Sequence, residues 1–282
     1  MTKYLNLVKF SHTIFAMPFA LIGFFSAIKQ DSYDFNLLLL LLIVLCMVFA
    51  RNSAMAFNRY ADRIIDAENP RTSNREIPSK KVSARNALTF TIVNSILFVV
   101  ATAFINRTTL FLSPIALAIV LSYSYTKRFT FLAHIILGIG LAIAPAGAYI
   151  AVSETLNLRI ILLSIVVLLW TAGFDILYSL QDEEFDRENG LFSIPAKFGR
   201  KTAMYISSLI HIISIGIMFL WAYIQDANYL LWSGVGVFTI LLIYQHLIVK
   251  PNDISRVNLA FGTTNGIASV CLATLTIISY FI

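Results

Sequence analysis

Two short acidic segments of the sequence carry side chains that could act together chemically. In the first, Asn58, Asp62 and Asp66 recur at intervals of four residues, so they would share one face of a helix. In the second, Asp182 and Asp186 repeat the same interval. Like charges at this spacing destabilise a helix by roughly a few tenths of a kcal/mol. The spacing therefore indicates that a cation neutralises these carboxylates.

A simpler interpretation is a solvated helix end with local ion pairs. Arg59 stands three residues before Asp62, and Arg63 three before Asp66, so each base could pair along the helix surface. The presence of two matched segments, each ending an apolar stretch, favours a shared cation site over this alternative.

The ligand types in these segments indicate which cation would bind. Carboxylate oxygens are hard ligands that select Mg²⁺ or Ca²⁺, and Mg²⁺ is commonly held by one or two carboxylates together with substrate phosphates. Zinc would call for His or Cys ligands, which the segments lack. Any one basic residue nearby could be ordinary topogenic charge, but as a group they suit phosphate oxygens. A metal-bridged diphosphate site is therefore predicted, with Arg71, Arg75, Lys127, Arg128 and Lys197 as the phosphate-binding candidates.

Two further groups of polar residues lie inside apolar stretches. Asp175 and Tyr178 stand seven and four residues before Asp182, which places them near its helix face. Arg51 stands seven residues before Asn58 and well inside an apolar run. An arginine at the centre of a membrane helix costs at least about 2.5 kcal/mol and normally has a polar partner. We predict a substrate anion as that partner, or else a nearby acid such as Asp175.

The elements that position these residues follow from composition. Of the 282 residues, 58% are hydrophobic and 13% are charged, whereas a soluble domain carries about 25% charged residues. Apolar runs near the length of about 20 residues that crosses a bilayer recur along the chain. We predict one all-α, polytopic membrane domain (1–282) with nine spans, at 13–29, 36–57, 86–104, 109–124, 132–152, 160–179, 203–223, 229–248 and 258–281.

The distribution of basic residues predicts the orientation of these spans. With nine spans, 17 of the 21 basic residues fall on the side of the N-terminus, three fall on the other side, and Arg51 lies within a span. By the positive-inside rule, the N-terminus and the acidic loops are cytoplasmic and the C-terminus is outside, in the cell inner membrane. The first span could imitate a secretory signal peptide, but eight further spans favour an uncleaved helix. Because the bases lie in short loops, nucleic acid is a poor candidate partner.

The two acidic segments also indicate an internal repeat. A shift of 120 residues relates the first segment to the second, placing Asn58, Asp62, Asp66, Glu68 and Asn69 on Tyr178, Asp182, Asp186, Glu188 and Asn189. The same shift relates the second span to the sixth. The first four spans and the next four are therefore expected to be related halves, with the ninth span additional. Repeats of this kind commonly place the functional site between the halves.

Four motifs carry a resemblance to a known superfamily. They are N-x-x-x-D-x-x-x-D at 58–66, N-P-R-T-x-x-R at 69–75, YSYTKRF at 123–129 and D-x-x-Y-x-x-x-D-x-x-x-D at 175–186. At these residues the sequence resembles the UbiA-type superfamily of intramembrane prenyltransferases. The stretches KFSHTIFAMPFAL and GFDILYSLQDEEFD are similar to the 4-hydroxybenzoate polyprenyltransferase branch, particularly to its relatives in the futalosine route to menaquinone. Glu76 departs from the pattern, since many relatives have proline there.

The resemblance implies a fold and a reaction. It implies helices around a central cavity that opens to lipid, two Mg²⁺ ions, and transfer of a polyprenyl group from its diphosphate to an aromatic acid in quinone biosynthesis. The acid would be 4-hydroxybenzoate or a dihydroxynaphthoate. The metals would be held by Asn58, Asp62, Asp66, Asp182 and Asp186, and the diphosphate by Arg71, Lys127 and Arg128. Asp175 and Tyr178 would lie near the reacting carbon, Asp175 or Asp182 would be the base, and Arg51 would bind the acceptor anion.

The resemblance leaves some residues and some rival functions open. His12 either helps bind the acceptor or reaches to the membrane interface. His134, His211 and His246 have no acidic motif around them and are interpreted as boundary or packing residues. A transporter would also have intramembrane charges and repeated halves. Prenyltransferases that act on haem, chlorophyll or a lipid glycerol would share the metal motifs.

Overall fold

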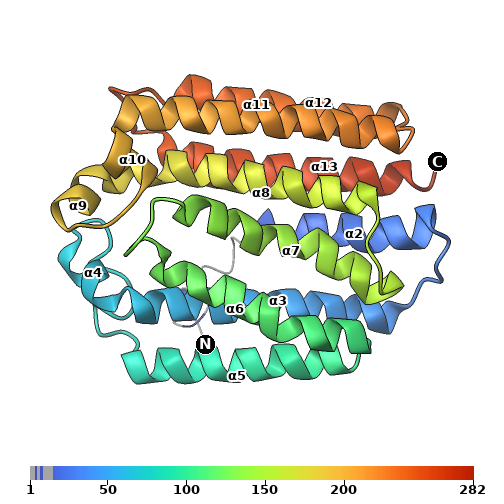
Figure 1. The fold of residues 1–282 in the computed structure, drawn as a ribbon, viewed down its shortest axis with the longest axis horizontal. Helices are drawn as coiled ribbons and strands as arrows, with labels where there is room; N and C mark the ends of the chain where they lie inside the picture. Colours follow the sequence, from blue (N-terminus) through green and yellow to red (C-terminus); the bar gives the residue numbers. More distant parts are fainter. Residues whose placement is uncertain (1–3, 5–6, 9–14) are drawn as a thin grey trace.

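Helices make up most of the chain in the computed structural model, which describes residues 4, 7–8 and 15–282 (Figure 1). The long helices are α2 (Met17–Gln30), α3 (Leu37–Ala61), α5 (Ala84–Ala103), α6 (Arg107–Thr126), α7 (Ala133–Ser153), α8 (Leu158–Ser179), α11 (Arg200–Ile224), α12 (Tyr229–Ile248) and α13 (Asn265–Ser279). Shorter helical segments connect them, namely α4 (Arg63–Glu68), η2 (Leu180–Asp182), α9 (Glu183–Glu188), α10 (Ile194–Phe198) and η3 (Leu259–Thr264). The predicted all-α class is confirmed.

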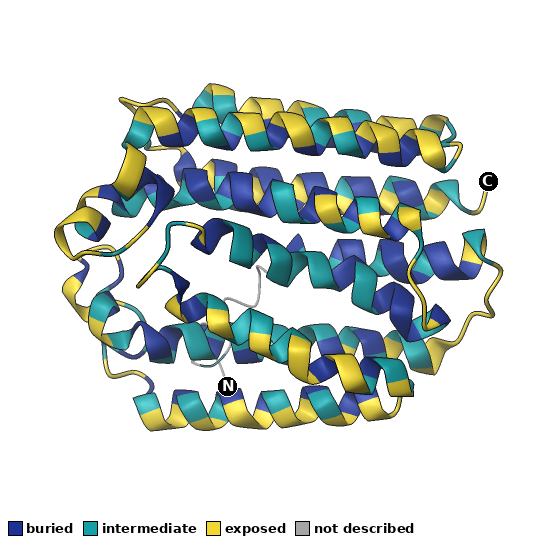
Figure 2. Cartoon of the chain, in the orientation of Figure 1, coloured by how far each residue is buried: buried dark blue, intermediate teal, exposed yellow. Residues whose placement is uncertain are grey.

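The membrane spans correspond closely to those predicted. Among the described residues, eight helices are long and apolar enough to cross a membrane. The first predicted span, 13–29, corresponds to α2, and residues 13 and 14 at its start, like His12, lie outside the described residues. Figure 2 shows exposed residues along the outer helices, where large apolar side chains such as Ile96, Ile212 and Ile240 are exposed. A surface of this kind fits contact with lipid.

Four of the long helices begin with the same capping residue. Asn36, Asn106, Asn157 and Asn228 precede α3, α6, α8 and α12, and each side chain accepts a hydrogen bond from a backbone N–H in the first turn. Asparagine is a strong helix N-cap because it satisfies a backbone donor that has no partner within the helix. All four caps lie in the loops predicted to be outside the cell. Each described helix that begins on this predicted outer side therefore has an asparagine N-cap.

The internal repeat is visible in the short helices at one end of the molecule. Adding 120 to the bounds of α4 gives the bounds of α9, and each helix directly follows an aspartate, Asp62 or Asp182. In both halves the helix before the short helix packs on the next long helix, α3 on α5 and α8 on α11. In Figure 1, α4 and α9 lie at the same end of the bundle. The fold therefore agrees with the prediction of two related halves.

Close helix contacts fix α7 in the middle of the bundle. A Cβ atom at Gly23 of α2 would lie 2.3 Å from the carbonyl oxygen of Pro145 in α7. A Cβ atom at Gly138 of α7 would lie 2.4 Å from the carbonyl oxygen of Leu168 in α8. Only glycine permits these approaches of one backbone to another. They hold α7 against α2 and against α8, and α8 leads into the second acidic segment.

The last span begins with a π-helical segment, η3. Asn265, the first residue of α13, donates from Nδ2 to the carbonyl oxygens of Ala260 and Phe261 in this segment. Its Oδ1 accepts a hydrogen bond of 2.8 Å from Trp170 Nε1 in α8. These bonds satisfy backbone groups that the wider helical turn would leave open. The segment places the Phe261 ring 4.1 Å from the Tyr178 ring, centroid to centroid, beside the second acidic segment.

Candidate active site

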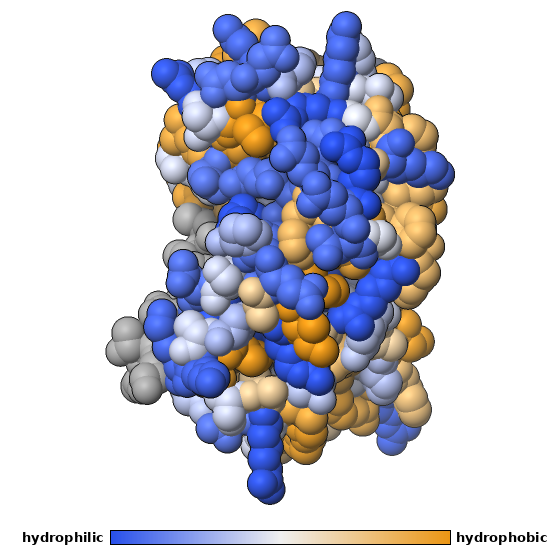
Figure 3. Space-filling view, turned by 90° about the vertical axis from the view of Figure 1, so that its left-hand side faces the viewer, coloured by the Kyte–Doolittle hydropathy of each residue, from blue (hydrophilic) through white to orange (hydrophobic). Residues whose placement is uncertain are grey.

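One cavity of about 900 Å³ runs between the helices of both halves. The two acidic segments line one part of it, and apolar side chains from α3, α5, α6 and α7 line much of the rest, among them Ile43, Met47, Phe98, Leu112 and Leu141. Figure 3 shows hydrophilic residues gathered over the face at the α4 and α9 end of the molecule. The cavity therefore combines a polar end with a long apolar region.

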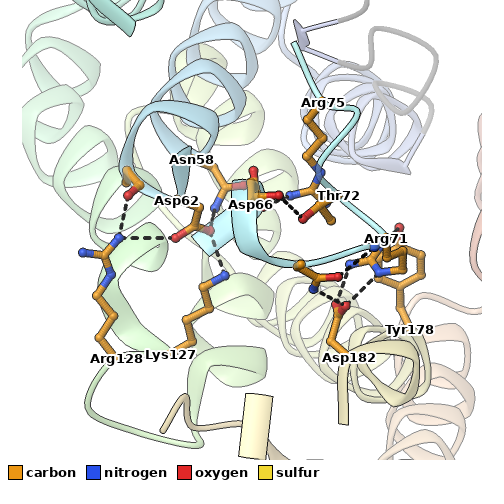
Figure 4. A network of polar contacts seen from close by, with 12 residues as sticks. Asn58, Asp62, Asp66, Arg71, Thr72, Arg75, Lys127, Arg128, Tyr178 and Asp182 are labelled. Atoms are coloured by element: carbon orange, nitrogen blue, oxygen red, sulfur yellow. Dashed lines mark hydrogen bonds and ion pairs between the residues drawn. The ribbon is translucent and has the colours of Figure 1, made fainter. Parts of the chain in front are cut away.

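Asp62, at the end of α3, lies beside two basic side chains from the turn that follows α6 (Figure 4). Its Oδ2 lies 2.9 Å from Lys127 Nζ, and its Oδ1 lies 3.4 Å from Arg128 Nη2. Asn58, one turn earlier, donates to Oδ2 at 3.2 Å. Arg128 also donates to the carbonyl oxygen of Ala61 at 2.6 Å. The turn after α6 is thus fixed against the first acidic segment.

Asp66, on α4, faces the loop that follows it. Arg75 Nη1 donates to its Oδ1 at 2.7 Å, and the Thr72 hydroxyl donates to its backbone carbonyl oxygen at 3.2 Å. Its other oxygen, Oδ2, is buried and has no hydrogen-bond partner. Buried polar atoms of proteins are almost always bonded, so this oxygen, on a residue that lines the cavity, is a candidate ligand position.

Asp182 joins the second segment to the first. Arg71 donates from Nε to Oδ1 at 2.8 Å and from Nη2 to Oδ2, and Asn69 donates to Oδ1 at 2.9 Å. Arg71 Nη1 also donates to the Tyr178 hydroxyl at 3.2 Å. Burial lowers the pKa of the Arg71 guanidinium, but its bonds to Asp182 outweigh burial and raise the pKa above the ordinary value. Because Asn69 and Arg71 follow α4, these bonds join the loop after the first acidic segment to the second segment.

Of two other residues predicted to belong to the site, Asp186 lines the cavity and Lys197 does not. Asp186, on α9, is buried and lines the same cavity. Lys197 does not line the cavity, because its Nζ lies 3.8 Å from the centre of the Phe131 ring and 5.2 Å from that of Phe198. Lys197 therefore interacts with aromatic faces rather than with the acidic site.

The simpler interpretation with local ion pairs is wrong for the described residues. Arg63 donates to the carbonyl oxygen of Tyr60 at 2.8 Å and lies over its ring. Arg59 is buried, and its Nε has no hydrogen-bond partner. The carboxylates pair instead with bases far along the chain, as described above. Neither arginine neutralises the acid three residues after it.

Arg51 lies on α3 and lines the cavity. Its Nε is buried without a hydrogen-bond partner. Asp175, the acid that could have paired with it, is bonded elsewhere, and none of the ion pairs of the described residues includes Arg51. An unpartnered buried donor on a residue that lines the cavity is suited to an anionic group of a ligand.

Asp175 has a partner that sequence reasoning missed. The Nδ1 atom of His134, on α7, lies 2.7 Å from Asp175 Oδ2. The backbone N–H of Ile194 donates to His134 Nε2 at 3.4 Å, so the ring proton resides on Nδ1 and is donated to Asp175. The two residues lie at similar distances from the turn between α7 and α8. Since antiparallel helices bring such positions level, the helix hairpin was a signal that could have paired them.

The carboxylate oxygens of the site are ligands of the type that a hard divalent cation prefers. The unpartnered oxygen of Asp66 is of the ligand type that Mg²⁺ prefers, and the other acids provide more such oxygens. Within the described part of the chain, no three His, Cys, Asp or Glu side chains are gathered closely enough to hold a metal. Asp62, Asp66 and Asp182 are instead bonded to basic residues. Holding a cation would require these pairs to separate.

Comparisons with known proteins agree with this geometry. A model of the UbiA prenyltransferase family matches residues 16–272. A 4-hydroxybenzoate octaprenyltransferase from Salmonella paratyphi B is 31% identical over 223 residues, which cover 78% of this chain and 76% of the relative.

Solved structures agree as well. The apo structure of a UbiA homologue from Aeropyrum pernix K1 has a TM-score of 0.85 at 31% identity and covers 95% of this chain and 97% of its own. A UbiA homologue from Archaeoglobus fulgidus, solved bound to GPP and Mg²⁺, has a TM-score of 0.73 at 20% identity over 99% and 100% of the two chains, a likeness of fold alone. These matches span most of the chain and leave no support for a transporter. The chain belongs to the UbiA prenyltransferase family.

Proposed function

We propose that this protein transfers a polyprenyl group from polyprenyl diphosphate to the ring of an aromatic acid, in the biosynthesis of a respiratory quinone. The observation that carries the proposal is the cavity, which has two converging acidic segments at one end and an apolar lining elsewhere. A diphosphate suits the first region and an isoprenoid tail suits the second. The names of the relatives, which are 4-hydroxybenzoate octaprenyltransferases, support the same reaction.

The polar end is assigned to the diphosphate and its metal ions. In this assignment Asn58, Asp62, Asp66, Asp182 and Asp186 hold Mg²⁺, the ion present with GPP in the archaeal homologue. When bound, Mg²⁺ supplies charge that stabilises the departing diphosphate. Arg71, Arg75, Lys127 and Arg128 bind its oxygens, and each now lies at a carboxylate of the site. Lys197 has no part in this assignment, since it lies against Phe131.

Departure of the diphosphate leaves an allylic cation, which the cavity walls would protect. Tyr123, Tyr178 and Phe174 line the cavity, and an aromatic face stabilises a desolvated cation by about 2 kcal/mol or more. The apolar lining excludes water, which would otherwise capture the cation. The proposed products therefore depend on a dry cavity as much as on the polar end.

Arg51 and Asp175 are assigned to the acceptor. The unpartnered Nε–H of Arg51 would bind the carboxylate of the acid. Of the two acids considered as the base, Asp182 has both oxygens occupied by Arg71 and Asn69, whereas Asp175 accepts only at Oδ2. Asp175 is therefore the group we assign to remove the ring proton, with Tyr178 beside it.

An acceptor panel tests this function. Membranes containing the protein are given polyprenyl diphosphate, Mg²⁺ and either 4-hydroxybenzoate, a dihydroxynaphthoate, haem or a glycerol phosphate, and products are identified by mass spectrometry. A prenylated aromatic acid that disappears on chelation and returns with Mg²⁺ is expected. Asp62→Ala and Asp182→Ala should each abolish the product. Product only with haem or glycerol phosphate, or no diphosphate release with any acceptor, would overturn the proposal.

A further inference from the structure

His134 stands out among the buried histidines because it joins the cavity to a second structural element. It is 3% exposed, lines the cavity, and bonds Asp175 on α8 at one ring nitrogen and Ile194 at the start of α10 at the other. His211 and His246 differ, since they bond each other at 2.8 Å and neither lines the cavity. Of the three histidines that the structure describes, His134 is therefore the one that contacts a group assigned to the reaction.

The contact fixes which atom of Asp175 can react. Oδ2 accepts the Nδ1–H of His134, while Oδ1 accepts no hydrogen bond from the described residues. The side chain keeps 14% of its surface exposed. The backbone N–H of Ile194 occupies His134 Nε2, so the imidazole can donate to Asp175 but has no free nitrogen with which to take a proton itself. Asp175 thus presents a single open oxygen to the cavity.

The segment that holds His134 in this state is itself anchored. The backbone N–H of Phe192 donates to the carbonyl oxygen of Lys127 at 2.7 Å, and the Ser193 side chain caps α10. The start of α10 is therefore tied to the turn after α6. A hydrogen-bond chain consequently runs from this anchored backbone through one imidazole to the carboxylate.

We propose that His134 is a positioning residue that holds Asp175 as the ionised acceptor of the ring proton. The inference rests on the proposed function. In the step concerned, a ring carbon of the acceptor forms a bond to the allylic carbon, and its C–H bond then breaks. The electron pair of that bond restores the aromatic ring, and the proton goes to Asp175 Oδ1. His134 keeps its own proton throughout and stabilises the carboxylate by donating to Oδ2.

The test compares His134→Leu, which removes the donor, with His134→Asn, whose side-chain amide can donate from near the position of Nδ1. His246→Leu is the matched control, because it removes a half-buried histidine that lies outside the cavity lining. For each variant, kcat and KM are measured with acceptor whose reacting ring positions carry hydrogen or deuterium. Cleavage of the prenyl diphosphate without acceptor is measured in parallel.

His134→Leu is expected to lower kcat by roughly 10- to 100-fold, the effect of losing a hydrogen bond to a charged group, with KM for both substrates unchanged. Proton removal then limits the rate, so a deuterium effect on kcat should appear or increase. His134→Asn should recover most of kcat, His246→Leu should resemble the wild type, and acceptor-free cleavage should stay unchanged in all variants.

Two results would overturn the inference while leaving the proposed function intact. One is a His134→Leu protein that makes the prenylated acid at the wild-type rate. The other is a slow His134→Leu protein with no greater deuterium effect and equal loss of acceptor-free cleavage, which would assign His134 to folding alone. If the wild type prenylates no aromatic acid, the proposed function itself fails, which is a distinguishable outcome.

Discussion

At the scale of single residues, three carboxylates of the site each form an ion pair with a basic side chain. Asp62 is bonded to Lys127, Asp66 to Arg75 and Asp182 to Arg71, and each pair joins groups at least nine residues apart. Such pairs leave the acids neutralised without any ligand, which removes the repulsion that their spacing would cause. The same arrangement provides a direct test of which bases belong to the site.

Lys127 and Lys197 form a matched pair for that test. Both were phosphate-binding candidates, but Lys127 Nζ lies 2.9 Å from Asp62 and Lys197 Nζ lies over Phe131. Lys127→Ala should lower kcat/KM for the prenyl diphosphate by roughly 10- to 100-fold, as expected for a lost charged hydrogen bond. Lys197→Ala should change it by less than about threefold, since exposed charges contribute little. Steady-state kinetics decide, and equal losses would return Lys197 to the site.

Arg51 predicts a selective effect on the acceptor. If its buried guanidinium binds the carboxylate of the acid, Arg51→Ala should raise KM for that acid by roughly tenfold or more. The variant should use a phenol that lacks the carboxylate about as well as the wild type does. Both acceptors are compared at saturating prenyl diphosphate. Equal losses with the two acceptors would contradict a carboxylate contact.

At the scale of elements, the sequence predicted the arrangement of the site better than its contacts. The 120-residue shift that relates the two acidic segments in the sequence also relates the bounds of α4 to those of α9. The pairing of Asp62 with Lys127 could not be read from spacing, because it depends on how α6 packs against α3. His134 was missed for the same reason, and Lys197 was assigned to the site on charge alone although its side chain lies beside aromatic rings.

The close approach of α2 and α7 gives a prediction about stability. A Cβ at Gly23 would overlap the carbonyl oxygen of Pro145, so Gly23→Ala must push two helices apart, at a cost of about 1–3 kcal/mol. Gly216→Ala is the control, because nothing lies within 4 Å of its added Cβ. Thermal unfolding in detergent should show a lower melting temperature for the first variant only. A wild-type melting temperature for Gly23→Ala would contradict the predicted helix contact.

At the scale of the whole molecule, the basic residues and the asparagine caps lie on opposite sides of the bundle. Basic residues gather in the loops that carry α4 and α9, and the four asparagine caps lie in the loops at the opposite side. Hydrophilic residues gather on the face at the α4 and α9 end (Figure 3). From the distribution of basic residues, the positive-inside rule predicts that this face is cytoplasmic.

Single cysteines test this orientation. In a background without Cys46 and Cys271, Asp34→Cys and Glu188→Cys place one exposed thiol on each side, the first in the loop before α3 and the second at the end of α9. A membrane-impermeant maleimide should label Asp34→Cys in cells whose outer membrane has been permeabilised, and Glu188→Cys only after the inner membrane is opened. Labelling in the reverse order would invert the proposed topology. Retained activity of both variants confirms that each remains folded.

The acid–base pairs of the site have a consequence for the end of the catalytic cycle. In the proposed reaction, the free pyrophosphate must leave the proposed phosphate-binding residues Arg71, Arg75 and Lys127 once the prenyl group has been transferred. In the described arrangement these bases already have intramolecular anions within reach, Asp182, Asp66 and Asp62. Release therefore replaces contacts between the bases and pyrophosphate with contacts between the bases and these carboxylates. The bases are not left as unpaired charges in a medium of low polarity. Pyrophosphate should consequently be a weak product inhibitor, with an inhibition constant well above KM for the prenyl diphosphate.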